Sequence, residues 1–197
     1  MKQDGILPKR MPPLTPTEIA INLSHYTCWY NLVNSNCDYA LILEDDVKLL
    51  PTFKKDMKKI LKNVSNINFS ILHLWNGNWA DTNYKLSYVK GRKNNTIYRE
   101  TIPYNAGAVA YIISKDYAQF LLKRGLPIKM QQDILMGTYL SRRIHLTLKM
   151  AYNTTQECYE SPLLDLDCGG SGGTGEQTTQ THYIEPLNKT LKCGKCY

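Results

Sequence analysis

The stretch Tyr39-Ala-Leu-Ile-Leu-Glu-Asp-Asp46 joins five consecutive apolar residues to three consecutive acids. A short unbroken apolar run of this kind is typical of a strand that is buried on both faces of a parallel or mixed sheet. In an open α/β sheet, ligands bind beyond the carboxyl ends of such strands. The stretch therefore predicts a central strand and, directly after it, a candidate ligand site.

Helical patterns lie on both sides of this strand. The segment 15–18 reads Thr-Pro-Thr-Glu, a capping box with proline at the first helical position, and it starts a helix that ends near Asn34. A second helix, from about residue 53 to 64, places an apolar face opposite a lysine face, and a second apolar strand covers 69–75. The order helix, strand, helix, strand predicts an α/β fold. We expect the first helix to pack through one face only, made of Ile19, Leu23, Tyr26, Tyr30 and Val33.

The rest of the chain continues this pattern and then loses it. After a hairpin-like excursion at 76–102, we expect a strand at 108–113, helices at 115–123 and 131–140, and a strand at 144–150. Five glycines within residues 169–175 exclude regular structure there. We therefore divide the chain into an α/β domain, 1–165, and a glycine-rich loop with a cysteine-containing tail, 166–197.

The charge of the chain is +7, from 24 basic and 17 acidic residues. Five of the lysines lie on the face of one predicted helix, where a solvated surface explains them, so we expect no nucleic-acid partner. No run of about 18 apolar residues occurs, which argues against a transmembrane segment. The N-terminus shows no secretory signal, so the compartment is left as cytoplasmic by default.

The three consecutive acids at 44–46 bring negative charges close together. Two carboxylates about 4 Å apart repel by about 4 kcal/mol at an effective dielectric of about 20, so the group must be solvated, protonated or neutralised by a cation. All-oxygen ligands favour Mn²⁺ or Mg²⁺. Strand alternation places Glu44 and Asp46 on one face and Asp45 on the other, unless the chain turns there. The alternative is a solvated acidic turn that caps the next helix.

Four motifs in register resemble glycosyltransferase family 25, which includes lipooligosaccharide and procollagen galactosyltransferases. They are Glu18 with Ser24-His25, the segment 39–47, the segment 105–114 (Asn-Ala-Gly-Ala-Val-Ala-Tyr-Ile-Ile-Ser), and Asp133. The resemblance implies a GT-A-like, Rossmann-like mixed sheet flanked by helices. One departure stands out: the chain lacks the family's first βα unit, which supplies part of the uridine pocket.

The resemblance also implies roles for individual residues. Glu44, Asp45 and Asp46 would hold Mn²⁺ (or Mg²⁺) and the donor diphosphate, with Asp46 as the main metal ligand. Asp133 would be the general base that takes the proton from the acceptor hydroxyl. Its alternative is a surface acid on an early helical turn, where the helix dipole also favours it.

Five further residues are candidates for the site: Gly107, Ser24, His25, His182 and Trp75. Gly107 would line the sugar site, and Ser24 with His25 would lie near the donor, although a buried structural hydrogen bond also explains His25. His182 is a candidate for a late metal or diphosphate contact, or a tail histidine without a role. Trp75 offers a flat apolar ring on which a sugar can stack.

The resulting prediction is a transferase that moves a hexose, galactose or glucose, from a UDP-sugar to a hydroxyl by metal-assisted inverting displacement. The acceptor would be a glycan, a lipid-linked glycan or a protein, which includes a collagen-like protein. The sequence is also compatible with an oligomer of the chain. Because the first βα unit is missing, the alternative is an inactive remnant that serves as a binding or assembly module.

Overall fold

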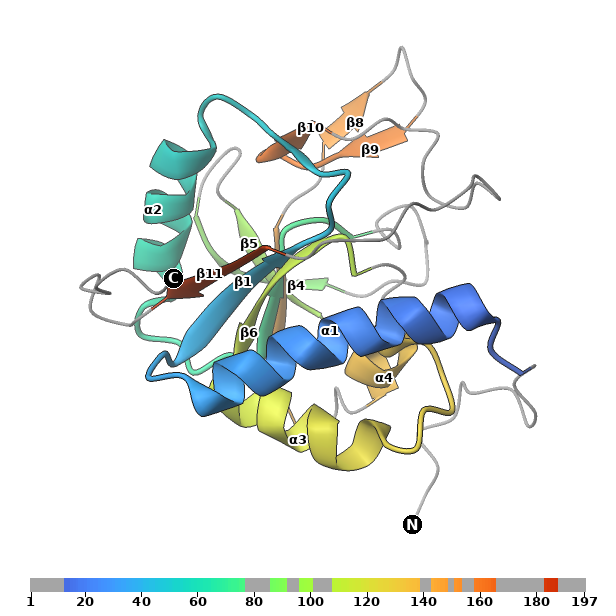
Figure 1. Ribbon diagram of the computed structural model, residues 1–197. Coiled ribbons are helices and arrows are strands. Elements are labelled where there is room, and N and C mark those ends of the chain that lie inside the picture. Colours follow the sequence, from blue (N-terminus) through green and yellow to red (C-terminus); the bar gives the residue numbers. More distant parts are fainter. Residues whose placement is uncertain are drawn as a thin grey trace.

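The computed structural model describes residues 13–76, 86–91, 96–100, 108–138, 143–148, 151–153, 158–165 and 183–187. A central sheet has one helix on one face and three helices on the other (Figure 1). The predicted class, a mixed α/β sheet flanked by helices, is confirmed. No helix in these ranges is long and apolar enough to cross a membrane.

The four helices begin and end close to where the sequence predicts. They are α1 (Pro16–Asn34), α2 (Phe53–Val64), α3 (Lys115–Gly125) and α4 (Gln132–Thr138). The capping box is complete in α1, where Glu18 N–H donates to the Thr15 hydroxyl and the Glu18 carboxylate accepts from Thr15 N–H at 2.7 Å. The hydroxyl of Ser114 caps α3 in the same way by accepting from Tyr117 N–H. Local polar groups therefore set these helix starts.

The main sheet has seven strands in the order β11-β1-β6-β3-β7-β5-β4. Since β1 and β3 are both antiparallel to β6, they run parallel to each other and end on the same edge of the sheet. The seven strands are β1 (Tyr39–Leu43), β3 (Ile71–His73), β4 (Leu86–Lys90), β5 (Ile97–Glu100), β6 (Ala110–Ser114), β7 (His145–Leu148) and β11 (Tyr183–Leu187). Two small pairs complete the described strands: β2 (Lys48–Leu49) with β10 (Leu164–Asp165), and β8 (Ala151–Asn153) with β9 (Cys158–Glu160).

The predicted hairpin at 76–102 is the antiparallel pair β4 and β5. Gly91 follows β4 with φ 104°, a backbone conformation that side-chain-bearing residues seldom adopt. The strand β5 then pairs with β7, which joins the hairpin to the main sheet.

Two apolar layers fill the space between sheet and helices. The odd residues of β1 face α2, whose Phe53, Met57 and Ile60 are buried while its lysines are exposed. The even residues of β1, Ala40 and Ile42, face the layer formed by α1, α3 and α4. Burial of both faces of β1 explains why its sequence is apolar without alternation.

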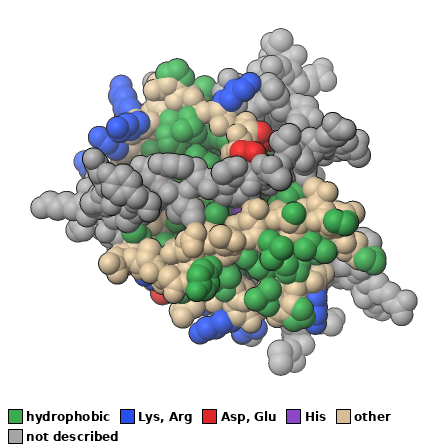
Figure 2. All heavy atoms as spheres, viewed as in Figure 1, with side chains coloured by type: hydrophobic (Ala, Val, Ile, Leu, Met, Phe, Trp, Pro, Cys, Tyr) green, Lys and Arg blue, Asp and Glu red, His purple; other side chains and the backbone are tan. Residues whose placement is uncertain are grey.

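The packed face of α1 differs from the prediction. Ile19, Leu23 and Tyr30, assigned to the core face, are among the most exposed large apolar residues in the described ranges, and Figure 2 shows apolar side chains gathered along α1. Tyr26 is buried and Val33 is partly buried, as predicted. The other buried residues, which the prediction did not include, are Asn22, His25, Cys28, Trp29 and Leu32. Because apolar residues occur all round this helix, periodicity alone did not distinguish its two sides. Hydrogen bonds to Asn22 and His25 allow the more polar side to face the sheet.

The strand β11 was not predicted from the sequence. It lies antiparallel to β1, and its first residue, Tyr183, pairs with Leu43. Part of the segment 166–197 thus completes the main sheet at the strand that leads to the acids (Figure 1).

Candidate functional site

The three acids lie in a tight turn at the end of β1. Glu44 N–H donates to the Val109 carbonyl at 2.9 Å, which keeps Glu44 in register with the sheet, and Val47 N–H donates back to the Glu44 carbonyl at 3.3 Å. The chain therefore turns at Asp45 and Asp46 instead of continuing as a strand. The strict alternation of the three side chains, expected for a continued strand, does not apply here.

The carboxylates of this acidic turn, Glu44 to Asp46, are close enough to affect one another. Glu44 is mostly buried, whereas Asp45 and Asp46 are exposed. Partial desolvation, together with the charges of Glu44 and Asp45, raises the pKa of Asp46 above its ordinary range. Among the described residues, no Lys or Arg forms an ion pair with Asp45 or Asp46. The turn is thus a concentrated negative charge at the edge of the sheet.

This donor set fits a hard divalent cation. Mn²⁺ and Mg²⁺ accept carboxylate oxygens and commonly use only one or two of them, with phosphate oxygens and water as the other ligands. Within the described part of the chain, no three His, Cys, Asp or Glu side chains are grouped closely enough to hold a metal by themselves. The acidic turn therefore suits a metal that arrives with a phosphate ligand better than a metal held by the protein alone.

His25 reaches the acidic turn from the middle of α1. Its Nε2 lies 3.6 Å from Glu44 Oε1, and its Nδ1 lies 2.8 Å from the hydroxyl of Tyr111 on β6. The indole N–H of Trp29 donates to the same hydroxyl at 3.0 Å. Burial lowers the pKa of His25 to about 3, against the opposing charge of Asp133. The imidazole is therefore neutral, and the buried hydrogen bond considered for it in the sequence is present.

Asp133 lies in the first turn of α4, on the helical side of the sheet. Its Oδ1 accepts from Ile134 N–H at 2.7 Å, and its charge acts on His25, which in turn contacts Glu44. The preceding segment is held to α1 by a hydrogen bond from the Gln131 amide to the Glu18 carboxylate. The fold thus places Glu44 beside His25 and lets the charge of Asp133 act on the same ring, although 89 residues of sequence separate Glu44 from Asp133.

Four other residues were predicted to belong to the site: Ser24, Trp75, Gly107 and His182. Ser24 is half-buried, and its hydroxyl donates to the Ala20 carbonyl of its own helix at 3.1 Å. Trp75 follows β3, is half-buried and packs against the α2 side of the core. Gly107 and His182 lie outside the described residues. Their neighbours in sequence are described: Ala108 is buried, and Tyr183 pairs with Leu43.

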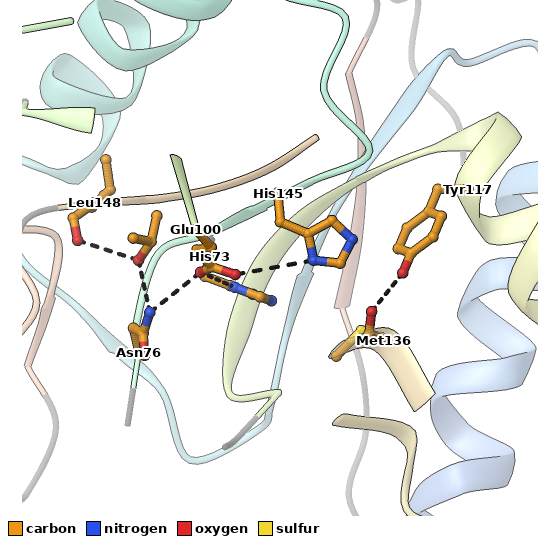
Figure 3. Close-up of polar contacts among 8 residues, drawn as sticks. His73, Asn76, Glu100, Tyr117, Met136, His145 and Leu148 are labelled. Carbon is orange, nitrogen blue, oxygen red and sulfur yellow. Dashed lines mark hydrogen bonds and ion pairs between the residues drawn. The ribbon is translucent and has the colours of Figure 1, made fainter. Parts of the chain in front are cut away.

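A second polar cluster lies on the same face of the sheet and was not predicted. Glu100 on β5 has one carboxylate oxygen 2.7 Å from His73 Nδ1 and the other 4.0 Å from His145 Nδ1, and the Asn76 amide donates to Glu100 and to Thr147 (Figure 3). All of these side chains are buried. Burial lowers the pKa of His145 well below its ordinary value, with a further contribution from the charge of His73. This arrangement is a buried hydrogen-bonded pair of His73 and Glu100 beside His145.

The two clusters meet at neighbouring strands. Tyr111 of β6 is the register partner of His73 of β3, so the polar side chains form a band across one face of the sheet. The signal available in the sequence was the presence of Tyr111, His73 and Glu100 within otherwise apolar or alternating strands. Neither Tyr111 nor Glu100 was predicted to belong to a site, because a polar residue in a strand does not by itself reveal its partner.

Comparisons with known proteins identify a family for the chain. A profile described as "Glycosyltransferase family 25 (LPS biosynthesis protein)" matches residues 6–136, more than half of the chain. The chain is similar to procollagen galactosyltransferase 2 of Homo sapiens, with 29% identity over 112 residues that make up 56% of this chain and 15% of that protein. It is also similar to a glycosyltransferase 25 family member of Aedes aegypti, with 37% identity over 60 residues, 30% of this chain and 10% of that protein.

A further relative is procollagen galactosyltransferase 1 of Danio rerio, with 27% identity over 128 residues that make up 59% of this chain and 19% of that protein. The chain spans less than a fifth of the length of the curated relatives it matches. The matched segment contains the acidic turn, His25 and Asp133. On the extent of the family match, the chain belongs to glycosyltransferase family 25.

Proposed function

We infer that this chain carries the donor and metal site of a glycosyltransferase that moves a hexose from a UDP-sugar to a hydroxyl acceptor. The single observation that carries the inference is the position of the acidic turn directly after β1, with Glu44 beside the buried ring of His25. Glu44 of the acidic turn lies 3.6 Å from His25, and the charge of Asp133 on α4 acts on the same ring. Such a site, at the carboxyl edge of β1, is where an α/β sheet binds a phosphate-bearing ligand. A GT-A arrangement of the sheet is part of this proposal.

The acidic turn would hold the cation. Asp46, with its raised pKa, and Glu44 are the proposed ligands of Mn²⁺ or Mg²⁺, and Asp45 contributes charge beside them. The ion, when bound, supplies positive charge that stabilises the leaving diphosphate. His182 is a third proposed ligand, since the next residue, Tyr183, is paired beside the acidic turn. Gly107, Ser24 and Trp75 remain proposals for contacts with the donor.

Asp133 is the proposed general base. In an inverting displacement, this carboxylate takes the proton from the acceptor hydroxyl as that oxygen attacks the anomeric carbon, a contribution of roughly 10²–10⁴-fold in rate. The bond from Ile134 N–H fixes the orientation of the carboxylate on α4. Position at the start of a helix also favours its ionised form.

Galactose is the first donor sugar to test, because two of the similar proteins are named procollagen galactosyltransferases. Glucose is the second. The acceptor classes remain those expected from the sequence: a glycan, a lipid-linked glycan or a protein.

Calorimetric titration of the chain with UDP, with and without Mn²⁺, tests the proposal. We expect metal-dependent binding that falls by at least about tenfold in Asp46→Asn and is unchanged in Asp56→Asn, a partly buried acid of α2 paired with Lys59. Asp133→Asn should keep this binding and lose turnover of UDP-galactose. If the unmodified chain shows no metal-dependent heat with UDP, the transferase proposal fails and the binding or assembly module takes its place.

A further inference from the structure

We propose that His25 is a positioning residue whose Nε2–H group is aimed at Glu44, because its Nδ1 is held by the hydroxyl of Tyr111, which in turn accepts a hydrogen bond from Trp29. The inference deepens the proposed function and rests on it, because the purpose of orienting Glu44 is to present its carboxylate to the cation. It changes the role considered for His25 from a contact with the donor to an action through Glu44.

The directions of the hydrogen bonds follow from what each group can donate. The indole N–H of Trp29 can only donate, so the hydroxyl oxygen of Tyr111 accepts from it. Tyr111 is fully buried, and its hydrogen requires an acceptor. His25 Nδ1, at 2.8 Å, is the partner that the structure provides. Nδ1 therefore accepts, and the single proton of the neutral ring lies on Nε2.

That proton is directed to the acidic turn. Nε2 is 3.6 Å from Glu44 Oε1, which is longer than a hydrogen bond and shortens to one with a small movement of the Glu44 side chain. Catalytic contacts are often long before ligands bind.

The ring itself is held firmly. His25 and Tyr111 stack with centroids 5.8 Å apart and an interplanar angle of 19°, and Trp29 packs against His25 from the next helical turn. All three side chains are fully buried. A rotation that exchanged Nδ1 and Nε2 would break the bond to Tyr111 and leave a buried hydroxyl without an acceptor.

A neutral donor has a specific advantage at this position. A lysine or arginine would neutralise Glu44 and repel a divalent cation. If Glu44 itself were protonated, its carboxyl group would not bind the cation at all. The N–H of a neutral imidazole orients the carboxylate and leaves its negative charge in place, as outer hydrogen-bond partners commonly do for metal ligands.

Two substitutions of the same residue separate this role from mere packing. In His25→Gln, the side-chain amide nitrogen lies near the place of Nε2, whereas in His25→Asn it lies near the place of Nδ1. Both variants lose the ring. We expect His25→Gln to keep Mn²⁺-dependent UDP affinity close to that of the unmodified chain, and His25→Asn to lose on the order of 10–100-fold. Equal losses in the two variants would overturn the proposal.

A spectroscopic measurement tests the relay, which is the chain of contacts from Trp29 through Tyr111 and His25 to Glu44, without any ligand. Long-range ¹⁵N–¹H correlation spectra at neutral pH should show His25 protonated at Nε2 and not at Nδ1, with the assignment made from the signal lost in His25→Gln. Tyr111→Phe should alter these shifts. The control is Tyr117→Phe, which removes another fully buried hydroxyl, donated at 2.5 Å to the Met136 carbonyl, and should leave them unchanged (Figure 3).

The two experiments also distinguish the proposed transferase function from the proposed role of His25. If the unmodified chain does not bind UDP with Mn²⁺, the proposed function fails, and the relay is judged by the tautomer alone. A proton on Nδ1 would overturn the relay whatever the ligand data show.

Discussion

Tyr183 of β11 lies opposite Leu43 of β1, the last residue before the acidic turn. The pairing continues to Leu187, which lies opposite Tyr39 at the other end of β1. A segment near the C-terminus therefore returns to the strand that leads to the candidate site. In the sequence, the glycine-rich stretch lies between β10, which pairs with β2, and β11, which pairs with β1.

This pairing predicts an effect of His182, which precedes Tyr183. In His182→Ala, the Mn²⁺-dependent affinity for UDP should fall by roughly tenfold or more, as expected for the loss of a metal ligand, while the melting temperature without ligand stays the same. Calorimetry and thermal unfolding provide the two measurements. Asn188→Ala, at the residue that follows β11 in the sequence, is the matched control and should change neither. A normal affinity in His182→Ala would remove this residue from the site.

The bond between Glu100 and His73 predicts a large stability effect. Glu100→Gln leaves His73 without its buried counter-charge, so the free energy of unfolding should fall by about 3–5 kcal/mol. Urea denaturation measures it. Asp56→Asn removes an exposed pair with Lys59 and should cost at most about 1 kcal/mol. Similar small losses in both variants would show that Glu100 and His73 do not form a charged pair.

His145 predicts a dependence of stability on pH. Its pKa in the folded chain is well below 6.5, so below that pH the unfolded chain binds a proton that the folded chain excludes. The free energy of unfolding should therefore decrease on acidification, with this residue contributing up to about 1.4 kcal/mol per pH unit.

The variant His145→Asn should reduce this slope between pH 7 and pH 5 by about one proton, as measured by urea denaturation at several pH values. The slope should not vanish, because His25 is a second buried neutral histidine with a pKa of about 3. An unchanged slope in the variant would mean that His145 titrates alike in the folded and unfolded chains.

The contact between α1 and α3 predicts that Gly125 tolerates no side chain. The Tyr26 hydroxyl donates to the Gly125 carbonyl at 3.0 Å, and a Cβ at Gly125 would lie 2.4 Å from that hydroxyl oxygen and 2.9 Å from a methyl carbon of Leu135. Gly125→Ala should therefore destabilise the chain by about 1–3 kcal/mol.

A double-mutant cycle identifies the cause of that loss. Tyr26→Phe removes the oxygen that the new methyl group would meet, so Gly125→Ala should cost less in the Tyr26→Phe background than alone. Thermal or urea unfolding of the four proteins gives the coupling. Additive losses would place the strain at the ring of residue 26 or at Leu135, because the Tyr26 Cζ atom lies 2.7 Å and a Leu135 methyl carbon 2.9 Å from the new Cβ.

Much of the fold was predictable because its signals are local. The capping box at Thr15, the apolar face of α2 and the unbroken apolar run of β1 each depend on residues within a few positions of one another, and the structure confirms all three. Three acids after a buried strand likewise marked the candidate site without any knowledge of the partners. The charge and backbone preferences of short segments determined these features.

Tertiary structure decided the features that depend on distant residues. It decided which side of α1 is buried, because His25 on that side has a hydrogen-bond partner 86 residues away on β6. It also paired β11 with β1 and brought His25 to 3.6 Å from Glu44. A buried polar group is stable only when its partner is in place, and the sequence alone does not identify that partner.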